Sequence, residues 1–359
     1  MRLGIIGLPQ SGKTTVFNAL TRGHAPTGSM LGGGRFEVHT AVVTVPDPRV
    51  DKLSGMFKPR KTIYAQVSYV DIAGLGKGVG KTGLTGSFRA TLGQLDAFVH
   101  VLRTFTDEAV PHPEVTLDAQ RDLEMLDGEF LLADLVAIES RIERLHESMT
   151  RGGSKDKSVD QREAALFERL KAALEAETPL RDVELAPEEE KGLRGYGFLS
   201  QKPVLIAINA GEDTSGVPPI QYPHRHSAVM TLQGKIEMEI AQLPPDEAAV
   251  FLAEYGIAET TRERIIRGTY RLLGLQSFFT VGEDEVRAWT IHTGDNAVAA
   301  AGEIHTDFAK SFIRAEVIAY QDLIDAGDMA HARTLGKLRL EGKEYIVQDG
   351  DILNIRHSA

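Results

Sequence analysis

The stretch Gly7-Leu8-Pro9-Gln10-Ser11-Gly12-Lys13-Thr14 fits the pattern G-x-x-x-x-G-K-[ST]. Residues 2–6 before it are mostly apolar and predict a short strand, and the apolar positions among residues 16–20 predict a helix after it. In this context the pattern binds phosphate, because successive N–H groups point inward at the positive end of the helix. We therefore expect a nucleoside triphosphate site formed by Gly7, Leu8, Pro9, Gln10, Ser11, Gly12, Lys13, Thr14 and Thr15.

Two residues of this loop and two later ones are expected to carry the chemistry. Lys13 adds a positive charge for the β- and γ-phosphates and is expected to act in catalysis. The Thr14 hydroxyl is an expected Mg²⁺ ligand, and Asp71, at the end of a strand predicted over 65–70, is expected to hold Mg²⁺ through water. Gly74 completes an Asp-x-x-Gly pattern, and its N–H is expected to reach the γ-phosphate in catalysis, since no side chain blocks the approach.

The composition limits the class of protein. The 359 residues carry a net charge of −11 and include no cysteine, which excludes disulfides, cysteine zinc sites and thiolate catalysis. The acidic total gives no reason to expect DNA binding. No apolar run approaches the roughly 20 residues of a membrane helix, and a strand that starts at residue 2 leaves no room for a signal peptide. We expect a cytoplasmic protein with no membrane partner.

The remaining pattern predicts an α/β fold with a mainly parallel sheet. Buried strands are expected over 97–102 and 204–209. Glycine-rich loops over 23–40 and 75–87 are placed where nucleotide-sensing switches would lie, and a plain linker is the alternative for 23–40 that composition leaves open. Gly80-Lys81-Thr82 mimics a second phosphate loop, but Leu75 stands where that pattern needs glycine. From Phe278 onward, short strands and turns predict a separate small α+β domain.

A helical arm is predicted in the middle of the chain. A heptad seam is followed by a polar turn at 151–158 and a returning helix, so we expect an antiparallel helical hairpin inserted into the nucleotide-binding domain. The seam consists of Leu131, Leu135, Ile138, Ile142, Leu145 and Met149. The predicted domains are 1–118 and 199–276 for the two parts of the nucleotide-binding domain, 119–198 for the arm and 277–359 for the C-terminal domain.

With these elements in place, the chain resembles the YchF family of Obg-related nucleotide hydrolases over nearly its full length. The motifs that carry the resemblance are Gly7 to Thr14, Pro46-Asp47-Pro48-Arg49, Asp71-Ile72-Ala73-Gly74-Leu75, Phe278-Phe279-Thr280, Glu285 to Thr290, Ile304 to Phe308 and Gly336 to Gly342. The resemblance implies a G-domain-like P-loop NTPase fold, a helical arm and a C-terminal TGS domain, which is a small β-grasp fold. It also implies an ATPase that associates with ribosomes and with stress responses.

The residues expected around the purine base are Asn209, Ala210 and Glu212. GTPases of this group carry Asn-Lys-x-Asp here, with the Asp paired to guanine and the Lys stem over the ring. Ala210 offers no stem, and Glu212 is one methylene longer than Asp, which spoils the tight fit at a cost of roughly 1–3 kcal/mol. The resemblance, in which Asn-x-x-Glu accompanies ATP preference, points the same way. We expect ATP to be preferred, with GTP binding as the alternative.

The residue that positions the attacking water is expected to be His112. Many relatives place Gln after the Asp-x-x-Gly glycine, but Leu75 cannot orient water. The resemblance indicates a histidine in the loop after the strand that ends near Arg103, and His112 lies at the matching distance. Considered alone, the position of His112 between two prolines favours an exposed loop residue, and the resemblance makes the two interpretations about equal.

Two positions depart from the family pattern. Gln10 replaces an Asn that can help coordinate a monovalent cation, so stimulation by potassium stays open. Arg35 stands where the family has a Thr that caps Mg²⁺, with Thr40 a poor substitute by register. Arg35 is also a candidate arginine finger acting on the γ-phosphate, or a solvated loop arginine.

Three functions remain open on the residues alone: a slow ATPase or GTPase switch, a small-molecule kinase, and an adaptor that binds nucleotide without hydrolysis. The arm shows no arginine-bearing lid, which a kinase would need. The expected partner is a ribosome or structured RNA, and six basic residues of the C-terminal domain could form the patch that contacts it. In the alternative, these residues are scattered charges that face the solvent. The patch would consist of Arg287, Lys310, Arg314, Lys337, Arg339 and Lys343.

Overall fold

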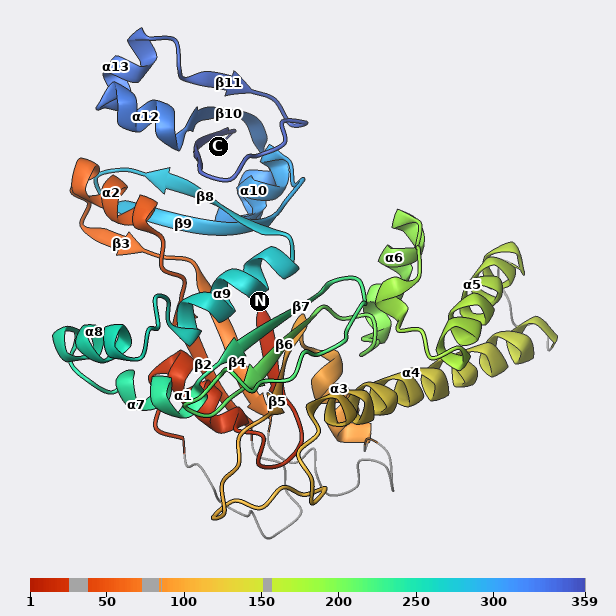
Figure 1. Cartoon of the computed structure of the whole chain (residues 1–359). Coiled ribbons are helices and arrows are strands. Elements are labelled where there is room, and N and C mark those ends of the chain that lie inside the picture. Colours follow the sequence, from red (N-terminus) through yellow and green to blue (C-terminus); the bar gives the residue numbers. More distant parts are fainter. Residues whose placement is uncertain (26–37, 73–83, 85, 151–156, 359) are drawn as a thin grey trace. The chain divides into compact units, whose positions relative to one another are not determined.

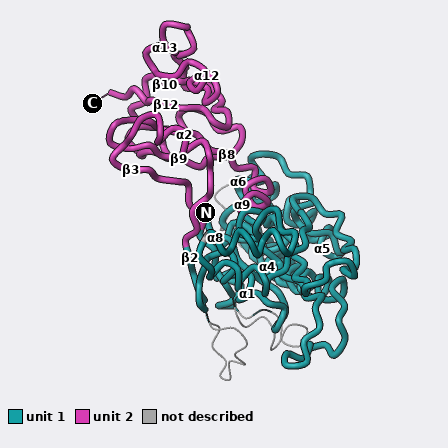
Figure 2. The backbone as a smooth tube through the Cα atoms, turned by 60° about the vertical axis from the view of Figure 1, so that its left-hand side comes forward, with its two compact units in different colours: residues 1–41, 68–265 teal, residues 42–67, 266–359 magenta. Residues whose placement is uncertain are grey.

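The structure is a computed structural model that describes residues 1–25, 38–72, 84, 86–150 and 157–358. It divides into two compact units, the first made of residues 1–41 and 68–265 and the second of residues 42–67 and 266–359 (Figure 2). The chain therefore leaves the first unit within one strand, β2 (Val38–Thr44), and returns to it within another, β4 (Gln66–Ile72).

The first unit is built on a six-stranded sheet with the order β2-β4-β1-β5-β6-β7 (Figure 1). The pairs β1–β4, β1–β5, β5–β6 and β6–β7 are all parallel. This confirms the predicted parallel α/β fold. The three central strands are almost wholly buried, as strands covered on both faces must be. They are β1 (Arg2–Ile6), β5 (Ala97–Arg103) and β6 (Val204–Asn209). The two edge strands are β2 and β7 (Ser227–Leu232).

Helices cover this sheet and fix the ends of its strands. Side chains of α3 (Gly86–Gly93) and of the first turns of α4 (Ala119–Thr150) form one apolar cluster with β1, β4, β5 and β6. Helix α1 (Lys13–Thr21) packs against α7 (Gly234–Ile240). Because the strands are parallel, the loops that follow β1, β4, β5 and β6 all lie at the carboxyl-terminal end of the sheet. Open α/β sheets bind their ligands at this end.

The predicted helical arm is present. Helix α4 continues out of the first unit's core and packs against α5 (Lys157–Glu175), as the seam predicts (Figure 1). Ile138 and Ile142 of the seam form a core with Phe167, and Leu131 and Leu135 pack against it. At the root of the arm, the buried Asp134 carboxylate accepts hydrogen bonds from the main-chain N–H groups of residues 199 and 200 at 2.9 and 2.7 Å.

The remaining elements of the first unit are short helices. They are η1 (Leu180–Asp182), α6 (Pro187–Leu193), η2 (Arg194–Tyr196) and α8 (Pro245–Glu254), while α9 (Thr261–Leu272) runs from the first unit into the second. None of the helices within the described ranges is long and apolar enough to cross a bilayer.

The second unit is a mixed six-stranded sheet with the order β11-β10-β12-β8-β9-β3 and its own apolar core. The strands are β3 (Lys61–Ile63), β8 (Leu275–Val281), β9 (Glu285–His292), β10 (Phe312–Ala319), β11 (Arg339–Glu341) and β12 (Asp351–His357). The helices are α2 (Pro48–Phe57), α10 (Ala297–Ile304), α11 (Thr306–Lys310), α12 (Tyr320–Ala326) and α13 (Met329–Thr334).

The domain to which residues 42–67 belong differs from the sequence prediction, which placed them in the nucleotide-binding domain. In the structure they belong to the second unit, where β3 pairs in parallel with β9. The Arg49 guanidinium bonds to Asp349 at 2.8 Å and lies 5.0 Å from the centre of the Phe279 ring. The sequence offers no signal for this attachment, because Asp349 lies 300 residues further along the chain.

Candidate functional site

Glycines at both ends of residues 7–14 make the tight loop that the pattern requires. Gly7 has φ +147°, and a Cβ there would lie 2.4 Å from the carbonyl oxygen of Val101. Gly12 has φ +90°, and a Cβ there would lie 2.1 Å from the side-chain nitrogen of Asn209. Any other residue at these two positions would therefore push the loop away from β5 and β6. Helix α1 begins at Lys13, directly after Gly12, so its free N–H groups face the loop.

Lys13 is buried, and its ammonium group donates to the carbonyl of Leu8 at 2.6 Å. Burial lowers the pKa of Lys13 to about 8 from 10.5, and the nearby charge of Asp71 opposes this shift. A buried ammonium group with a single carbonyl acceptor gains from an anion placed in the loop. Lys13 is therefore placed for the phosphate contact that the sequence predicts.

The residues present fit a magnesium ion. The Thr14 hydroxyl donates to Oδ2 of Asp71 at 2.8 Å, so the two side chains meet. The other carboxylate oxygen, Oδ1 of Asp71, is buried and has no hydrogen-bond partner within the described part of the chain. Burial raises the pKa of Asp71, while the hydrogen bond from Thr14 and the charge of Lys13 oppose this. A divalent cation beside Asp71 would satisfy the free oxygen, and Mg²⁺ commonly combines one or two protein oxygens with phosphate oxygens and water.

Asn209 joins the phosphate loop to the expected purine loop. Its side-chain nitrogen donates to the carbonyl of Ser11 at 3.0 Å, and its oxygen accepts from the N–H of Gly234 at 3.1 Å. Both ends of the Asn209 side chain are thus engaged in holding the two loops together. Contacts to a purine base would have to come from the neighbouring residues. Ala210 is buried and Glu212 is exposed, so the glutamate carboxylate is free to turn toward a ligand.

His112 does not contact the phosphate loop in this structure. Its Nε2 lies 2.9 Å from Oδ2 of Asp122, its Nδ1 accepts from the N–H of Glu114 at 3.1 Å, and its side chain is 5% exposed. The accepting Nδ1 carries no proton, so Nε2 is the donor to Asp122. Both ring nitrogens are engaged, and His112 has to leave Asp122 before it can orient a water molecule. The reading of His112 as an exposed loop residue is wrong for its side chain.

The structure adds two residues that the sequence analysis had not singled out for a role. Arg103, the last residue of β5, is buried and bonds to three main-chain carbonyls. A Cβ added at Gly211 would lie 3.6 Å from the Cβ of Phe105. Phe105 therefore borders the expected purine loop. A polar residue at the carboxyl end of a central parallel strand was the available signal for Arg103.

Several expected residues lie outside the described part of the chain. They are Gly74, Leu75 and Arg35, together with both glycine-rich segments over most of their lengths. Thr40 is described and is an exposed residue of β2. The roles assigned to these residues stay predictions.

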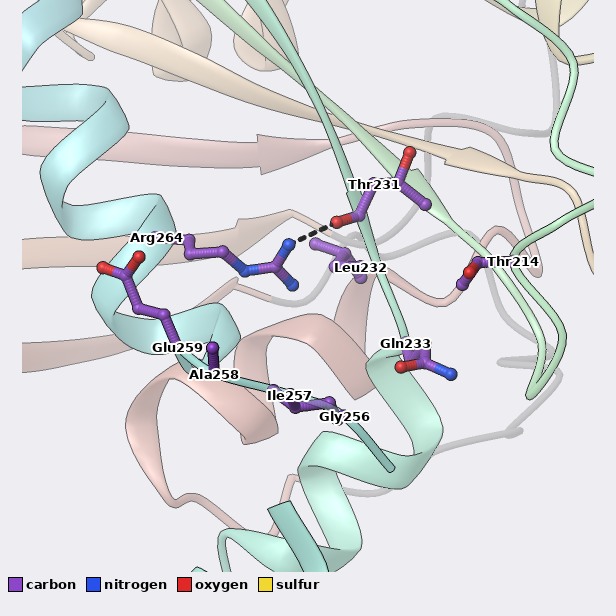
Figure 3. Close-up of a pocket in the computed structure, with 9 residues that line it drawn as sticks. All are labelled: Thr214, Thr231, Leu232, Gln233, Gly256, Ile257, Ala258, Glu259 and Arg264. Atoms are coloured by element: carbon purple, nitrogen blue, oxygen red, sulfur yellow. Dashed lines mark hydrogen bonds between the residues drawn. The ribbon is translucent and has the colours of Figure 1, made fainter. Parts of the chain in front are cut away.

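A pocket of about 560 Å³ lies next to the purine loop, along the open edge of β7 (Figure 3). Arg264 donates to the carbonyl of Thr231 at 2.6 Å on one side of it. On another side, the amide of Gln233 donates to the carbonyl of Glu212 at 2.7 Å. The pocket is lined by none of residues 7–15 and is separate from the phosphate site.

His100 is a buried residue of the central strand β5, and we expect it to make the stability of the protein fall at acidic pH. Burial lowers the pKa of His100 to about 3, and the charges of Lys13 and Arg181 lower it further; its Nε2 has no hydrogen-bond partner among the described residues. Its folded pKa lies below the unfolded value, so the unfolded state binds more protons as pH falls through 6.5, and stability falls with it.

Replacing His100 by leucine removes this titration. Between pH 6.5 and 5 the wild-type protein is expected to lose roughly 2 kcal/mol more unfolding free energy than His100→Leu. Urea unfolding at the two pH values measures the difference. Parallel losses in the two proteins would contradict the assignment.

Together these features define a P-loop nucleotide-binding protein with a parallel sheet of the G-domain type. Residues 2–121 match the family model described as "50S ribosome-binding GTPase", and residues 275–358 match YchF-GTPase_C, described as "Protein of unknown function (DUF933)".

Relatives match over almost the whole chain. The chain is 40% identical to "Ribosome-binding ATPase YchF" of Bacillus subtilis, with 98% of each chain covered. It is 35% identical to "Obg-like ATPase 1" of Caenorhabditis elegans, covering 100% of this chain and 92% of that one. The solved structure of the Schizosaccharomyces pombe YchF GTPase superposes with a TM-score of 0.82 at 30% identity, covering 99% of this chain and 97% of the other. The chain belongs to the YchF family.

Proposed function

We propose that this protein binds Mg²⁺ and ATP, hydrolyses ATP slowly, and uses the bound nucleotide to control its association with the ribosome. The observation that carries the proposal is the meeting of Lys13, Thr14 and Asp71 at the start of α1, behind a loop closed by two glycines with positive φ. Lys13 would bind the phosphates, and Thr14 and Asp71 would hold Mg²⁺, which supplies charge neutralisation between the phosphates when bound.

In this proposal His112 positions the attacking water after it separates from Asp122, and the N–H of Gly74 binds the γ-phosphate. A histidine held by two hydrogen bonds that it must leave is consistent with slow turnover, because the active arrangement forms only in a fraction of molecules.

The preference for ATP rests on the two side chains that follow Asn209. Ala210 is too short to cover a purine ring, and Glu212 is longer than the aspartate that pairs with guanine. The neighbouring Phe105, whose Cβ lies beside Gly211, carries no polar group that could pair with guanine, so it does not restore guanine selectivity. The alternative of GTP preference is favoured by the descriptions of two matches, the family model "50S ribosome-binding GTPase" and the solved Schizosaccharomyces pombe YchF GTPase.

A competition titration tests the proposal. With Mg²⁺ present, ATP is expected to bind about tenfold more tightly than GTP, consistent with a loss of 1–3 kcal/mol at the guanine edge. Phosphate release is expected from ATP without any added acceptor, which distinguishes hydrolysis from kinase activity. Binding of GTP tenfold tighter than ATP would contradict the base preference, and binding without phosphate release would favour the adaptor function. Replacing sodium by potassium in the same assay tests the effect of Gln10.

Association with the ribosome is proposed from the descriptions of the relatives, and it would place the protein in the cytoplasm. The expected basic patch in the second unit gives it limited support, because four of the six side chains are paired with nearby carboxylates. The pairs are Arg287–Glu285, Lys310–Asp307, Lys337–Asp322 and Arg339–Glu341. In the part of the chain that the structure describes, only Arg314 and Lys343 of the six lack an ion pair.

A further inference from the structure

Arg103 connects the phosphate loop to the loop that carries His112. One terminal nitrogen of its guanidinium donates to the carbonyl of Gln10 at 3.3 Å, and the other donates to the carbonyl of Val110 at 2.7 Å. Its Nε donates to the carbonyl of Phe105 at 3.0 Å. The three acceptors belong to two loops that are separated by more than ninety residues in sequence, since Gln10 is 93 residues from Arg103.

The guanidinium is held in one orientation. Arg103 is 3% exposed, and its guanidinium carbon lies 4.5 Å from the centre of the Phe105 ring. A planar fork on an aromatic face, with donors on both sides, fixes the relative positions of its acceptors more strictly than a flexible ammonium group can. Val110 lies two residues before His112 in the same loop, so a shift of its carbonyl would displace the main chain that carries the histidine.

At the other end, Gln10 is itself a residue of the phosphate loop. It adopts a positive φ of 61°, which is uncommon for a residue other than glycine. Its carbonyl accepts from Arg103, on the outside of a loop whose N–H groups are expected to turn inward toward phosphate. A change in the loop on binding phosphate would therefore move the carbonyl that Arg103 contacts.

No carboxylate lies within ion-pair distance of Arg103 among the described residues, and the charge of Asp107 acts on it only at longer range. A buried cation without a carboxylate partner is costly, so its three carbonyl acceptors have to stay in place. Movement of one acceptor is therefore expected to be followed by the others.

We propose that Arg103 is a positioning residue for hydrolysis, which transmits occupancy of the phosphate loop through the carbonyls of Gln10 and Val110 to the placement of His112. The inference rests on the proposed ATPase function and adds to it the route by which a bound triphosphate would release His112 from Asp122. Arg103 itself need not touch the nucleotide.

The kinetic test uses Arg103→Lys, which keeps the charge but loses the fork. The KM for ATP is expected to stay within about threefold, while kcat falls about tenfold. In a His112→Ala background, Arg103→Lys is expected to cause less than about a twofold further loss, because its effect acts through His112. Arg181→Lys is the matched control, since Arg181 is also buried, donates to the carbonyl of Ser200 and lies over the Tyr222 ring. It is expected to leave kcat unchanged.

A second measurement does not depend on hydrolysis. In the wild-type protein, Mg²⁺ with a non-hydrolysable ATP analogue is expected to change the hydrogen exchange of amides 106–116, and in Arg103→Lys this change is expected to disappear while the analogue still binds. Arg103→Gln serves in both experiments if the lysine variant does not fold.

The results separate the two proposals. If Arg103→Lys lowers kcat about tenfold in the His112→Ala background as well, the role of Arg103 is overturned and the ATPase proposal stands. The same conclusion follows if the exchange response in Arg103→Lys is unchanged from the wild type. Absence of triphosphate binding in the wild-type protein would overturn the proposed function itself.

Discussion

Replacing Lys13 by methionine is expected to lower ATP turnover by about 10²–10³-fold and ATP affinity by about 10–100-fold. Lys13 is a buried cation at the start of α1, and among the described residues it has one carbonyl acceptor, which leaves donors for phosphate oxygens. The variant removes both the charge that binds the triphosphate and the charge that stabilises the transition state. Phosphate release and a binding titration measure the two losses separately.

The same variant is expected to stabilise the protein in the absence of nucleotide, and urea unfolding checks that its loss of turnover does not come from unfolding. The pKa of Lys13 is lowered to about 8 in the folded state from 10.5, so the charged form disfavours folding. That cost is full below pH 8 and disappears as pH rises toward 10.5. At pH 7 it amounts to roughly 3 kcal/mol, of which the variant recovers part.

Lys202→Met is the matched control for Lys13. Lys202 is also a lysine whose pKa burial lowers, and it donates to the main-chain carbonyls of Gly93 and Leu95. Its replacement is expected to leave turnover unchanged. Near-normal turnover in Lys13→Met, or an equal loss in Lys202→Met, would contradict the role of the phosphate loop.

His112→Ala is expected to lower kcat by about 10²-fold while changing ATP affinity little. The imidazole would act on the attacking water only after it separates from Asp122, so its loss removes a contact made in the transition state and not one made with bound ATP. Single-turnover phosphate release, together with a binding titration, measures this split.

The chain provides a close control in a second histidine–aspartate pair. Nδ1 of His224 lies 2.7 Å from Oδ2 of Asp182, near the root of the arm. His224→Ala loses the same type of contact and is expected to keep normal turnover. Unchanged kcat in His112→Ala would remove His112 from the mechanism, and a similar loss in both variants would indicate a general structural effect.

The parts of the fold that sequence could predict depend on contacts between near neighbours. The loop with Gly7 and Gly12, the buried strands and the seam of the arm each follow from spacing within about twenty residues, and the structure contains all of them. Thr14 and Asp71 were predictable as a pair because parallel strands bring their carboxyl ends together. The attachment of residues 42–67 to the second unit was not predictable, since it depends on Arg49 meeting Asp349.

By itself, the sequence determined a loop of the phosphate-binding pattern followed by a helix, and it predicted Asp71 as a magnesium residue and a purine loop at 209–212 without the lysine stem. Only the tertiary structure decided that His112 is held by Asp122 and that Arg103 joins two loops. The physical reason lies in the acceptors. Arg103 and Asn209 donate to main-chain carbonyls, which every residue carries, so no residue type in the sequence marks where such a donor will bind.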